Sequence, residues 1–408
     1  MKVTTTPHSQ KIAPRPSAAS TASPGDSSFA QALAQAQQPR SMPMPPVSRW
    51  SSLSFLATTN APRMRFPFTQ SQMIAANAAA PVLSLPPTHA PAATFSVQKA
   101  AATAPTVGLP SQPMALTDYP HPPGDNGRGI HWIPTLSQSK EVVDKYVKEA
   151  VDMGMKWVVF LNDGANIGAN DYLVKKLAAA GIEPVMRIYS SGIVPISGDI
   201  ESMVKHYTDM GVHYFQIYNE PNLRVETGGK PADVKQYVKL WSDVAEKVIA
   251  GGGLPGFGAL SPQGEMDDRE FLQQALQALK ASGKLHLLDK GWLAMHNYTG
   301  PRPLSDPDGF LRFKQYNNII QQTLGRQVPI IGTEGGTHIS PLVSTEKQIN
   351  MVTGAYKYML HREPYNFAYT YWIIANGHDP AWNEHALFKD DGPTPLAQAL
   401  KAMAGGTA

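Results

Sequence analysis

The pattern of apolar and polar positions changes near residue 118. From residue 129 onward, short runs rich in β-branched and aromatic residues alternate with longer stretches whose apolar positions recur at helical spacing. The short runs predict strands at residues 129–133, 156–161, 183–189, 213–218, 256–261, 291–295, 329–333 and 367–373. The longer stretches predict helices at residues 139–153, 172–180, 232–250, 269–281, 309–324, 346–361 and 395–403. Such alternation is typical of an α/β domain.

Several of these strands begin shortly after a glycine. A glycine lies between a helical stretch and the strand that follows it at three places: Gly154, Gly181 and Gly211. Because glycine adopts the left-handed conformation that closes many helices, we expect helices to end at these positions.

Eight β/α units in about 280 residues match the length of a closed (β/α)8 TIM barrel. The competing arrangement is a doubly wound open sheet, whose nucleotide-binding forms carry a glycine-rich loop after the first strand. Here the first predicted strand continues into His131, Trp132, Ile133 and Pro134, which form no such loop. We therefore predict a TIM barrel for residues 119–408.

Residues 1–118 have a different composition, dominated by Ala, Pro, Ser, Thr and Gln. Of the 36 prolines in the chain, 20 precede Gly124. Such a segment buries too little apolar surface to offset the entropy of ordering it, so we expect disorder, with one short helical stretch at residues 28–37. Its first twenty residues lack the apolar centre of a secretory signal, and a composition that also suits signal-less bacterial secretion leaves the localisation open.

Charge and cysteine content exclude several classes of function. The net charge of +3 is too small to indicate a nucleic-acid partner. No stretch reaches the roughly 18 apolar residues needed to cross a bilayer, so no membrane partner is predicted. The absence of cysteine excludes disulfides, thiolate metal sites and cysteine nucleophiles.

Candidate chemistry lies at the predicted strand ends, because barrel active sites are built at the C-terminal ends of the strands. The fourth strand runs into Asn219 and Glu220, and the seventh into Glu334. Two carboxyl groups suit glycoside hydrolysis, in which one donates a proton to the leaving oxygen and the other faces the anomeric carbon. The nucleophile needs nearby donors to stay charged, whereas burial raises the pKa of the acid.

The motifs Tyr-Asn-Glu-Pro-Asn at residues 218–222 and Gly-Thr-Glu-Gly at residues 332–335 resemble those of the retaining glycoside hydrolases of clan A. Within the clan they are most similar to families 39 and 5, and among these to bacterial enzymes that cut exopolysaccharides. The resemblance covers about 280 residues, the whole predicted barrel. It implies a retaining hydrolase of a polymeric carbohydrate that needs no cofactor, with Glu220 as acid/base and Glu334 as nucleophile.

The resemblance also implies roles for neighbouring residues. Asn219 would hydrogen-bond the sugar 2-hydroxyl. His296 and Tyr298 match a His-x-Tyr pattern at the end of the sixth strand, where the tyrosine bonds the nucleophile and the histidine orients the acid/base or the sugar. Trp372, after the eighth strand, would form an aromatic floor under the sugar.

Two further residues are candidates from their places at strand ends. Arg187, on the third strand, is placed to hold Glu334 ionised through a charge-assisted hydrogen bond. His131, closing the first strand, either lines the site or packs in the wall. Other residues near the predicted rim either line the cleft or pack in the barrel wall and cap: Trp132, Asn162, Asp163, Asn376, His378, Trp382 and Asn383. Ser261, Gln263 and Glu265 follow the fifth strand without an assigned role.

Three alternatives were weighed. A metal-dependent barrel hydrolase would use rim histidines, but no His-x-His pair stands at a strand end. A Schiff-base aldolase needs a lysine at a strand end, whereas Lys156 and Lys290 lie at or before strand starts. A catalytically silent barrel that binds polysaccharide, or a scaffold, remains open. The separation of the two carboxyl groups bears on the mechanism, because about 5 to 5.5 Å indicates retention and roughly 6.5 Å or more indicates inversion.

Overall fold

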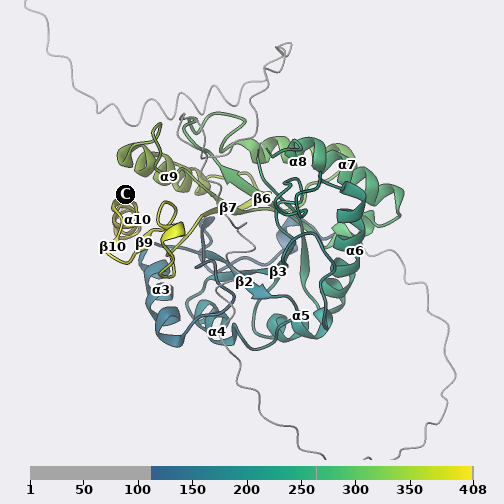
Figure 1. The fold of residues 1–408 in the computed structure, drawn as a ribbon, viewed down its shortest axis with the longest axis horizontal. Helices are drawn as coiled ribbons and strands as arrows, with labels where there is room; N and C mark the ends of the chain where they lie inside the picture. Colours follow the sequence, from purple (N-terminus) through teal and green to yellow (C-terminus); the bar gives the residue numbers. More distant parts are fainter. Residues whose placement is uncertain (1–111, 263, 407–408) are drawn as a thin grey trace, which may run out of the picture. The chain divides into compact units, whose positions relative to one another are not determined.

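The computed structural model describes residues 112–262 and 264–406. In this part of the chain, eight parallel strands follow one another in chain order, and β1 pairs with β8 to close a barrel. Helices form a ring around the strands (Figure 1). The predicted TIM barrel is confirmed. The segment predicted to be disordered, with its helical stretch at residues 28–37, lies outside the described residues as far as residue 111.

The eight predicted strands all coincide with barrel strands. These are β1 (Arg128–His131), β2 (Trp157–Asp163), β3 (Glu183–Tyr189), β4 (Tyr214–Ile217), β5 (Leu254–Leu260), β6 (Trp292–Tyr298), β7 (Ile330–Gly336) and β8 (Asn366–Tyr371). A short hairpin follows, made of β9 (Phe388–Lys389) and β10 (Gly392–Pro393).

The seven predicted helices are present, with ends that differ by a few residues. The helices are α3 (Lys140–Asp152), α4 (Asp171–Ala179), α5 (Ile200–Asp209), α6 (Val234–Ala250), α7 (Asp268–Ala281), α8 (Arg312–Leu324), α9 (Thr345–Met359) and α10 (Pro395–Gly405). Short 3-10 turns lie at η1 (Leu116–Asp118), η2 (Leu285–Asp289) and η3 (Pro380–Trp382). For helix α5 the sequence predicted only the end, at Gly211, and no range.

Glycine closes three of the helices as predicted. Gly154, Gly181 and Gly211 have φ angles of 69°, 65° and 100°. These left-handed conformations turn the chain from the ends of α3, α4 and α5 into the strands that follow.

An aromatic layer fills the N-terminal end of the barrel. Trp157, Tyr214 and Trp292 are the first residues of β2, β4 and β6, and Phe367 is the second residue of β8. The Trp157 and Tyr214 ring centroids lie 5.5 Å apart, and those of Tyr214 and Trp292 lie 5.7 Å apart. The even-numbered strands thus supply one layer of inward side chains, as barrels of this class do, and leave the opposite end for polar residues.

The segment before β1 packs against this aromatic layer. The Tyr119 hydroxyl donates to the Gly291 carbonyl at 2.8 Å, and Met114 and Leu116 contact the same cluster. The Tyr214 hydroxyl donates to the Pro120 carbonyl at 2.6 Å. Residues just before the predicted domain boundary at 118/119 therefore contribute contacts to the barrel floor.

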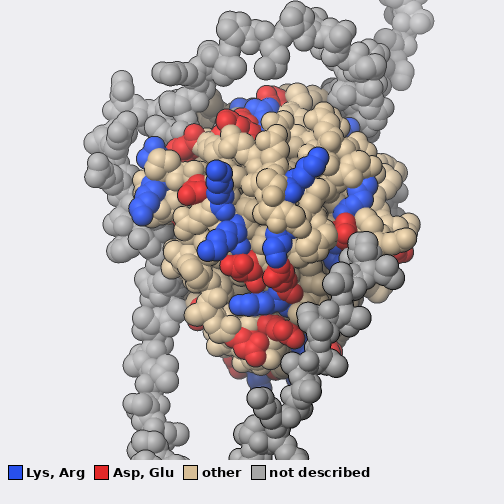
Figure 2. Space-filling model, turned by 90° about the vertical axis from the view of Figure 1, so that its right-hand side faces the viewer, with Lys and Arg blue, Asp and Glu red and all other residues tan. Residues whose placement is uncertain are grey.

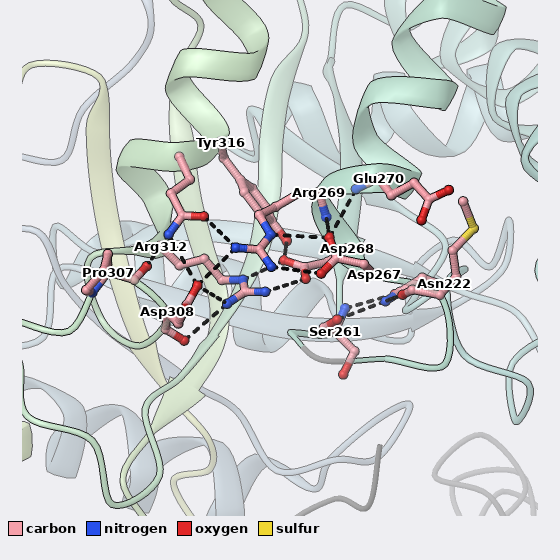
Figure 3. Close-up of polar contacts among 12 residues, drawn as sticks. Asn222, Ser261, Asp267, Asp268, Arg269, Glu270, Pro307, Asp308, Arg312 and Tyr316 are labelled. Carbon is pink, nitrogen blue, oxygen red and sulfur yellow. Dashed lines mark hydrogen bonds and ion pairs between the residues drawn. The ribbon is translucent and has the colours of Figure 1, made fainter. Parts of the chain in front are cut away.

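A buried ion pair joins the N-terminal ends of α7 and α8. Arg312 donates to both carboxylate oxygens of Asp268, at 2.6 and 2.5 Å, and the Tyr316 hydroxyl donates to the same carboxylate. The Arg312 and Tyr316 side chains point toward Asp268 (Figure 3). Helix N-termini lie at the end of the barrel where the strands finish, so this network holds the β5–α7 and β6–α8 loops in place.

Charged side chains of both signs are interspersed on the face shown in Figure 2, on the part of that face that the structure describes. Elsewhere in the described residues, oppositely charged side chains pair across helices, for example Lys176 on α4 with Asp144 on α3 at 2.7 Å. None of the helices in residues 112–406 is both long and apolar enough to span a bilayer.

Candidate active site

The two predicted catalytic carboxyl groups lie at the C-terminal ends of β4 and β7. Glu334 is part of β7 itself, whereas Glu220 comes three residues after β4 ends at Ile217. Tyr218 and Glu220 have φ angles of 65° and 36°, which side-chain-bearing residues rarely adopt. The Glu220 backbone N–H donates to the Ala259 carbonyl at 2.9 Å, so β5 holds this strained turn.

Glu220, Glu334 and His296 meet at this end of the barrel. One carboxylate oxygen of each glutamate and a nitrogen of His296 all lie within 4.8 Å of one another. His296 Nδ1 is 2.8 Å from Glu220 Oε1 and 3.6 Å from Glu334 Oε2. Residues from three different strands are thereby brought to one point.

Glu334 has two fixed hydrogen-bond donors. Arg187 Nη1, from β3, is 3.1 Å from Oε1, and the Tyr298 hydroxyl, from β6, is 2.8 Å from Oε2. Arg187 is 1% exposed and Glu334 is 2% exposed, so little solvent screens the ion pair. Both donors stabilise the ionised form of Glu334.

The environment of Glu220 favours its protonated form. Burial raises the pKa of Glu220 to about 7, although the Ser261 hydroxyl and the Arg187 charge oppose the rise. Burial also raises the pKa of Glu334, against the effects of His296, Arg187 and Tyr298. Two carboxyl groups this close titrate as a pair, and over a range of pH the pair holds one proton in total. The donors on Glu334 place the negative charge there and leave the proton on Glu220.

The site histidines are neutral near pH 7, because burial lowers the pKa of both His131 and His296. His131 Nδ1 lies 2.9 Å from the Trp132 carbonyl oxygen, which accepts only, so Nδ1 carries the hydrogen. His131 Nε2 is therefore an acceptor, and it is buried without a partner among the residues that the structure describes.

Trp372 lies in an aromatic cluster next to the carboxyl pair. It is 2% exposed and follows β8 directly, and the Trp372–Ile373 peptide bond is cis. Its ring centroid is 4.2 Å from that of His131 and 5.8 Å from that of Trp382. Tyr298 packs against the same cluster. These contacts place an aromatic surface next to the carboxyl pair.

Asn219 is buried and bonded to a residue that the sequence did not single out. Its side-chain Nδ2 donates to Glu226 Oε1 at 3.0 Å. Glu226 is 3% exposed although it lies in the β4–α6 loop. Nothing in the local sequence distinguishes it from a solvated loop glutamate.

Asn222 is a second residue that the sequence analysis left without a role. Its side chain accepts from the Ser261 backbone N–H at 3.0 Å and donates to the Ser261 carbonyl at 2.8 Å (Figure 3). The Ser261 hydroxyl hydrogen-bonds Glu220. Asn222 therefore ties the β5–α7 loop to the turn that carries Glu220.

Several other residues near the rim stabilise loops instead of joining the carboxyl pair. The Asn162 side chain donates to the Gly164 and Asn166 carbonyls at 3.1 and 3.0 Å. His378 is exposed and pairs with Asp390 at 2.7 Å. Trp132 packs edge-to-face on Tyr146, and the Asn376 side chain donates a hydrogen bond to Asn383.

The Glu220, His296 and Glu334 trio is also the set of described side chains best arranged to hold a metal ion. However, the Arg187 guanidinium lies 3.1 Å from Glu334 and would repel a cation bound there. The arrangement fits an acid paired with a charged nucleophile better than it fits a metal centre.

The fold and site define a TIM-barrel protein with a buried carboxyl pair at the catalytic end of the barrel. No protein-family model matches the chain, and none of the curated proteins matches it. A monomeric beta-xylosidase from Caulobacter crescentus CB15 is similar in structure, with 18% identity and a TM-score of 0.51 over 70% of this chain and 69% of that one.

Two further solved structures match at lower TM-scores. One is a GH128 endo-beta-1,3-glucanase from Pseudomonas viridiflava, with 19% identity and a TM-score of 0.47 over 68% of this chain and 98% of that one. The other is an endo-beta-1,4-mannanase from Thermotoga petrophila, with 12% identity and a TM-score of 0.46 over 71% and 78%. At these identities, the likeness to the xylosidase establishes a shared fold and leaves the activity to be argued from the site.

Proposed function

We propose that this chain is a retaining glycoside hydrolase that cleaves O-glycosidic bonds of a polysaccharide or oligosaccharide by double displacement. The observation that carries the proposal is the carboxyl pair, with oxygens of Glu220 and Glu334 within 4.8 Å of each other. An approach this close favours a retaining pair, whose carboxyl groups lie about 5 to 5.5 Å apart, over an inverting pair, whose carboxyl groups lie roughly 6.5 Å or more apart. Glu334 accepts hydrogen bonds from both Arg187 and Tyr298.

In the first step, a Glu334 carboxylate oxygen forms a bond to the anomeric carbon while the bond to the leaving oxygen breaks. Glu220 gives its proton to that oxygen, so the leaving group departs as an alcohol. The pKa of about 7 for Glu220 keeps the proton available near neutral pH. Tyr298 and Arg187 orient Glu334 for attack.

In the second step, water replaces Glu334 at the anomeric carbon. Esterification has removed the negative charge of Glu334, which lowers the cost of ionising Glu220 beside it. Glu220 therefore takes a proton from the attacking water, the carbon–oxygen bond to Glu334 breaks, and both carboxyl groups return to their starting states. Two inversions at one carbon give net retention.

The other site residues are assigned to the substrate. Asn219, His131 and His296 supply buried polar atoms without partners among the described residues, and these suit sugar hydroxyl groups. Trp372 supplies the apolar surface on which the C–H face of a pyranose packs. The resemblance to families 39 and 5, and with it a polymeric bacterial exopolysaccharide as substrate, stays a prediction.

The test is hydrolysis of a panel of bacterial and plant polysaccharides, with product sizing, by wild-type protein and two variants. We expect Glu220→Gln and Glu334→Gln each to lower the rate by about a thousandfold or more while leaving the thermal unfolding midpoint near that of the wild type. Glu270→Gln, an exposed change of the same type on α7, serves as the control and should keep wild-type activity.

Near-wild-type activity in either active-site variant would refute the assignment. The alternative from the sequence, a silent polysaccharide-binding barrel, predicts that the wild-type protein binds one of these polymers but releases no product. Wild-type turnover that both variants abolish excludes that alternative.

A further inference from the structure

Glu226 is a third buried carboxyl group near the carboxyl pair. Its place in the β4–α6 loop is fixed through the backbone, because its carbonyl accepts from the Ile193 N–H at 2.9 Å. Gly192, with φ +145°, allows this close crossing, since a Cβ there would lie 2.7 Å from the Glu226 carbonyl oxygen. The Glu226 backbone is thereby held in place independently of what its side chain bonds.

The Glu226 carboxylate bonds the side-chain amide of Asn219. An ionised carboxylate accepts hydrogen bonds and donates none. The Asn219 nitrogen must therefore face Glu226, where it is seen at 3.0 Å. Asn219 Oδ1 is turned the other way, and it is buried without a hydrogen-bond partner among the residues that the structure describes.

Asn219 directly precedes Glu220 in the chain, so its orientation matters at the bond that would be cleaved. A buried acceptor without a partner is unfavourable unless a ligand supplies a donor.

We infer that Glu226 is a positioning residue that fixes the amide of Asn219, so that Asn219 presents its oxygen to a donor hydroxyl of the substrate. This inference rests on the proposed function. It specifies the chemistry at that position: the sugar must bring a free hydroxyl group as donor, and a sugar that is deoxygenated or O-acylated there loses the contact.

The test is a double-mutant cycle, measured as kcat/KM on the polysaccharide that the wild-type enzyme hydrolyses. Gln at position 226 can accept or donate, so Glu226→Gln no longer forces one orientation on Asn219. We expect a loss of about tenfold for Glu226→Gln and about a hundredfold for Asn219→Ala. Because Glu226 acts through Asn219, the double variant should lie within about twofold of Asn219→Ala. If the two losses instead multiply, so that the double variant loses about a thousandfold, the inference is wrong.

A second experiment exchanges the hydrogen-bond donor and acceptor between positions 219 and 226. If Glu226 had only a structural role, this exchange would not restore activity. Asn219→Asp places two carboxylates face to face and should lower kcat/KM below that of Asn219→Ala. Adding Glu226→Gln restores a hydrogen bond in the reverse direction, from the glutamine amide to the aspartate, and frees the other aspartate oxygen for the substrate. We expect at least a fivefold recovery; no recovery would contradict the inference.

The outcomes separate this inference from the proposed function. If the wild-type protein hydrolyses no polysaccharide, the proposed function fails and the inference falls with it. If the wild-type protein is active and Glu220→Gln and Glu334→Gln are inactive, the cycle tests Glu226 alone. Thermal midpoints close to that of Glu270→Gln confirm that each variant is folded.

Discussion

Two carboxyl groups of the same chemical type acquire different properties at this site through their neighbours. Glu334 receives hydrogen bonds from Arg187 and Tyr298, whereas Glu220 faces a neutral histidine and a serine hydroxyl. Environment of this kind separates acid from nucleophile in other paired-carboxyl enzymes. Glu220 is therefore assigned as the acid and Glu334 as the nucleophile from their hydrogen bonds. Single substitutions can remove these hydrogen bonds and so test the assignment.

The pH dependence follows from the protonation that each role requires. Glu220 must be protonated, and its pKa is raised to about 7, so kcat/KM should be highest below that value and fall as pH rises through it. A 2,4-dinitrophenyl glycoside of the cleaved sugar needs little help from an acid, so this decrease should weaken with that substrate. Initial rates between pH 4 and 9 measure both profiles. Identical profiles for the two substrates would contradict the role of Glu220.

Tyr298→Phe removes one donor from Glu334 and leaves Arg187 in place. We expect kcat/KM to fall by about ten- to a hundredfold. The hydrogen bond favours the ionised carboxylate, so its loss should raise the pKa of Glu334 and move the acidic limb of the profile to higher pH. Tyr172→Phe, which removes a surface hydroxyl bonded to Asp144, is the matched control. An unchanged acidic limb would argue against Glu334 as the nucleophile.

Residues at strand ends could be identified from the sequence, because the barrel topology alone decides where they meet. Glu220, Glu334 and Arg187 were selected as candidates this way, whereas His296 and Tyr298 were selected through the resemblance to clan A. The roles of Glu226 and Asn222 depend on how two loops cross, as in the bond from Ile193 to the Glu226 carbonyl. No local sequence pattern encodes such a crossing, so the sequence does not distinguish a buried loop carboxylate from a solvent-exposed one.

At the scale of elements, the strands were predictable because both faces of a parallel barrel strand are covered. Such strands appear as short, nearly continuous apolar runs, and β3 was predicted with both of its ends. Gly211 predicted where helix α5 ends, but the range of the helix was not predicted, because it is only ten residues long and includes His206, Tyr207 and Thr208, which have weak helix propensity. Asp199, which caps its first turn, is the signal that could have identified it.

The ion pair between α7 and α8 provides a stability prediction at this scale. Arg312→Leu leaves the Asp268 carboxylate buried without its charged partner, so the free energy of unfolding should fall by about 3 kcal/mol. Replacing both residues with leucine should recover much of that loss. Chemical denaturation measures both changes. A loss of under about 1 kcal/mol for the single variant would show that the pair does not hold these helices.

At the scale of the whole molecule, the two ends of the barrel have different side chains. The N-terminal end is filled by the aromatic layer from the even strands and covered by the segment around Tyr119. The C-terminal end carries the carboxyl pair and the buried polar atoms. Because many unrelated activities share this fold, the account depends on the site and not on the architecture.

The most direct test of the account is to trap the covalent intermediate. A 2-deoxy-2-fluoro glycosyl fluoride of the sugar that the enzyme cleaves should inactivate the wild-type protein, because the 2-fluorine slows both oxocarbenium-like steps while the fluoride leaving group speeds only the first. Mass spectrometry of the digested protein should then find one sugar on the peptide that contains Glu334. A sugar attached to Glu220, or steady turnover to a product of inverted anomeric configuration with no adduct, would contradict the account.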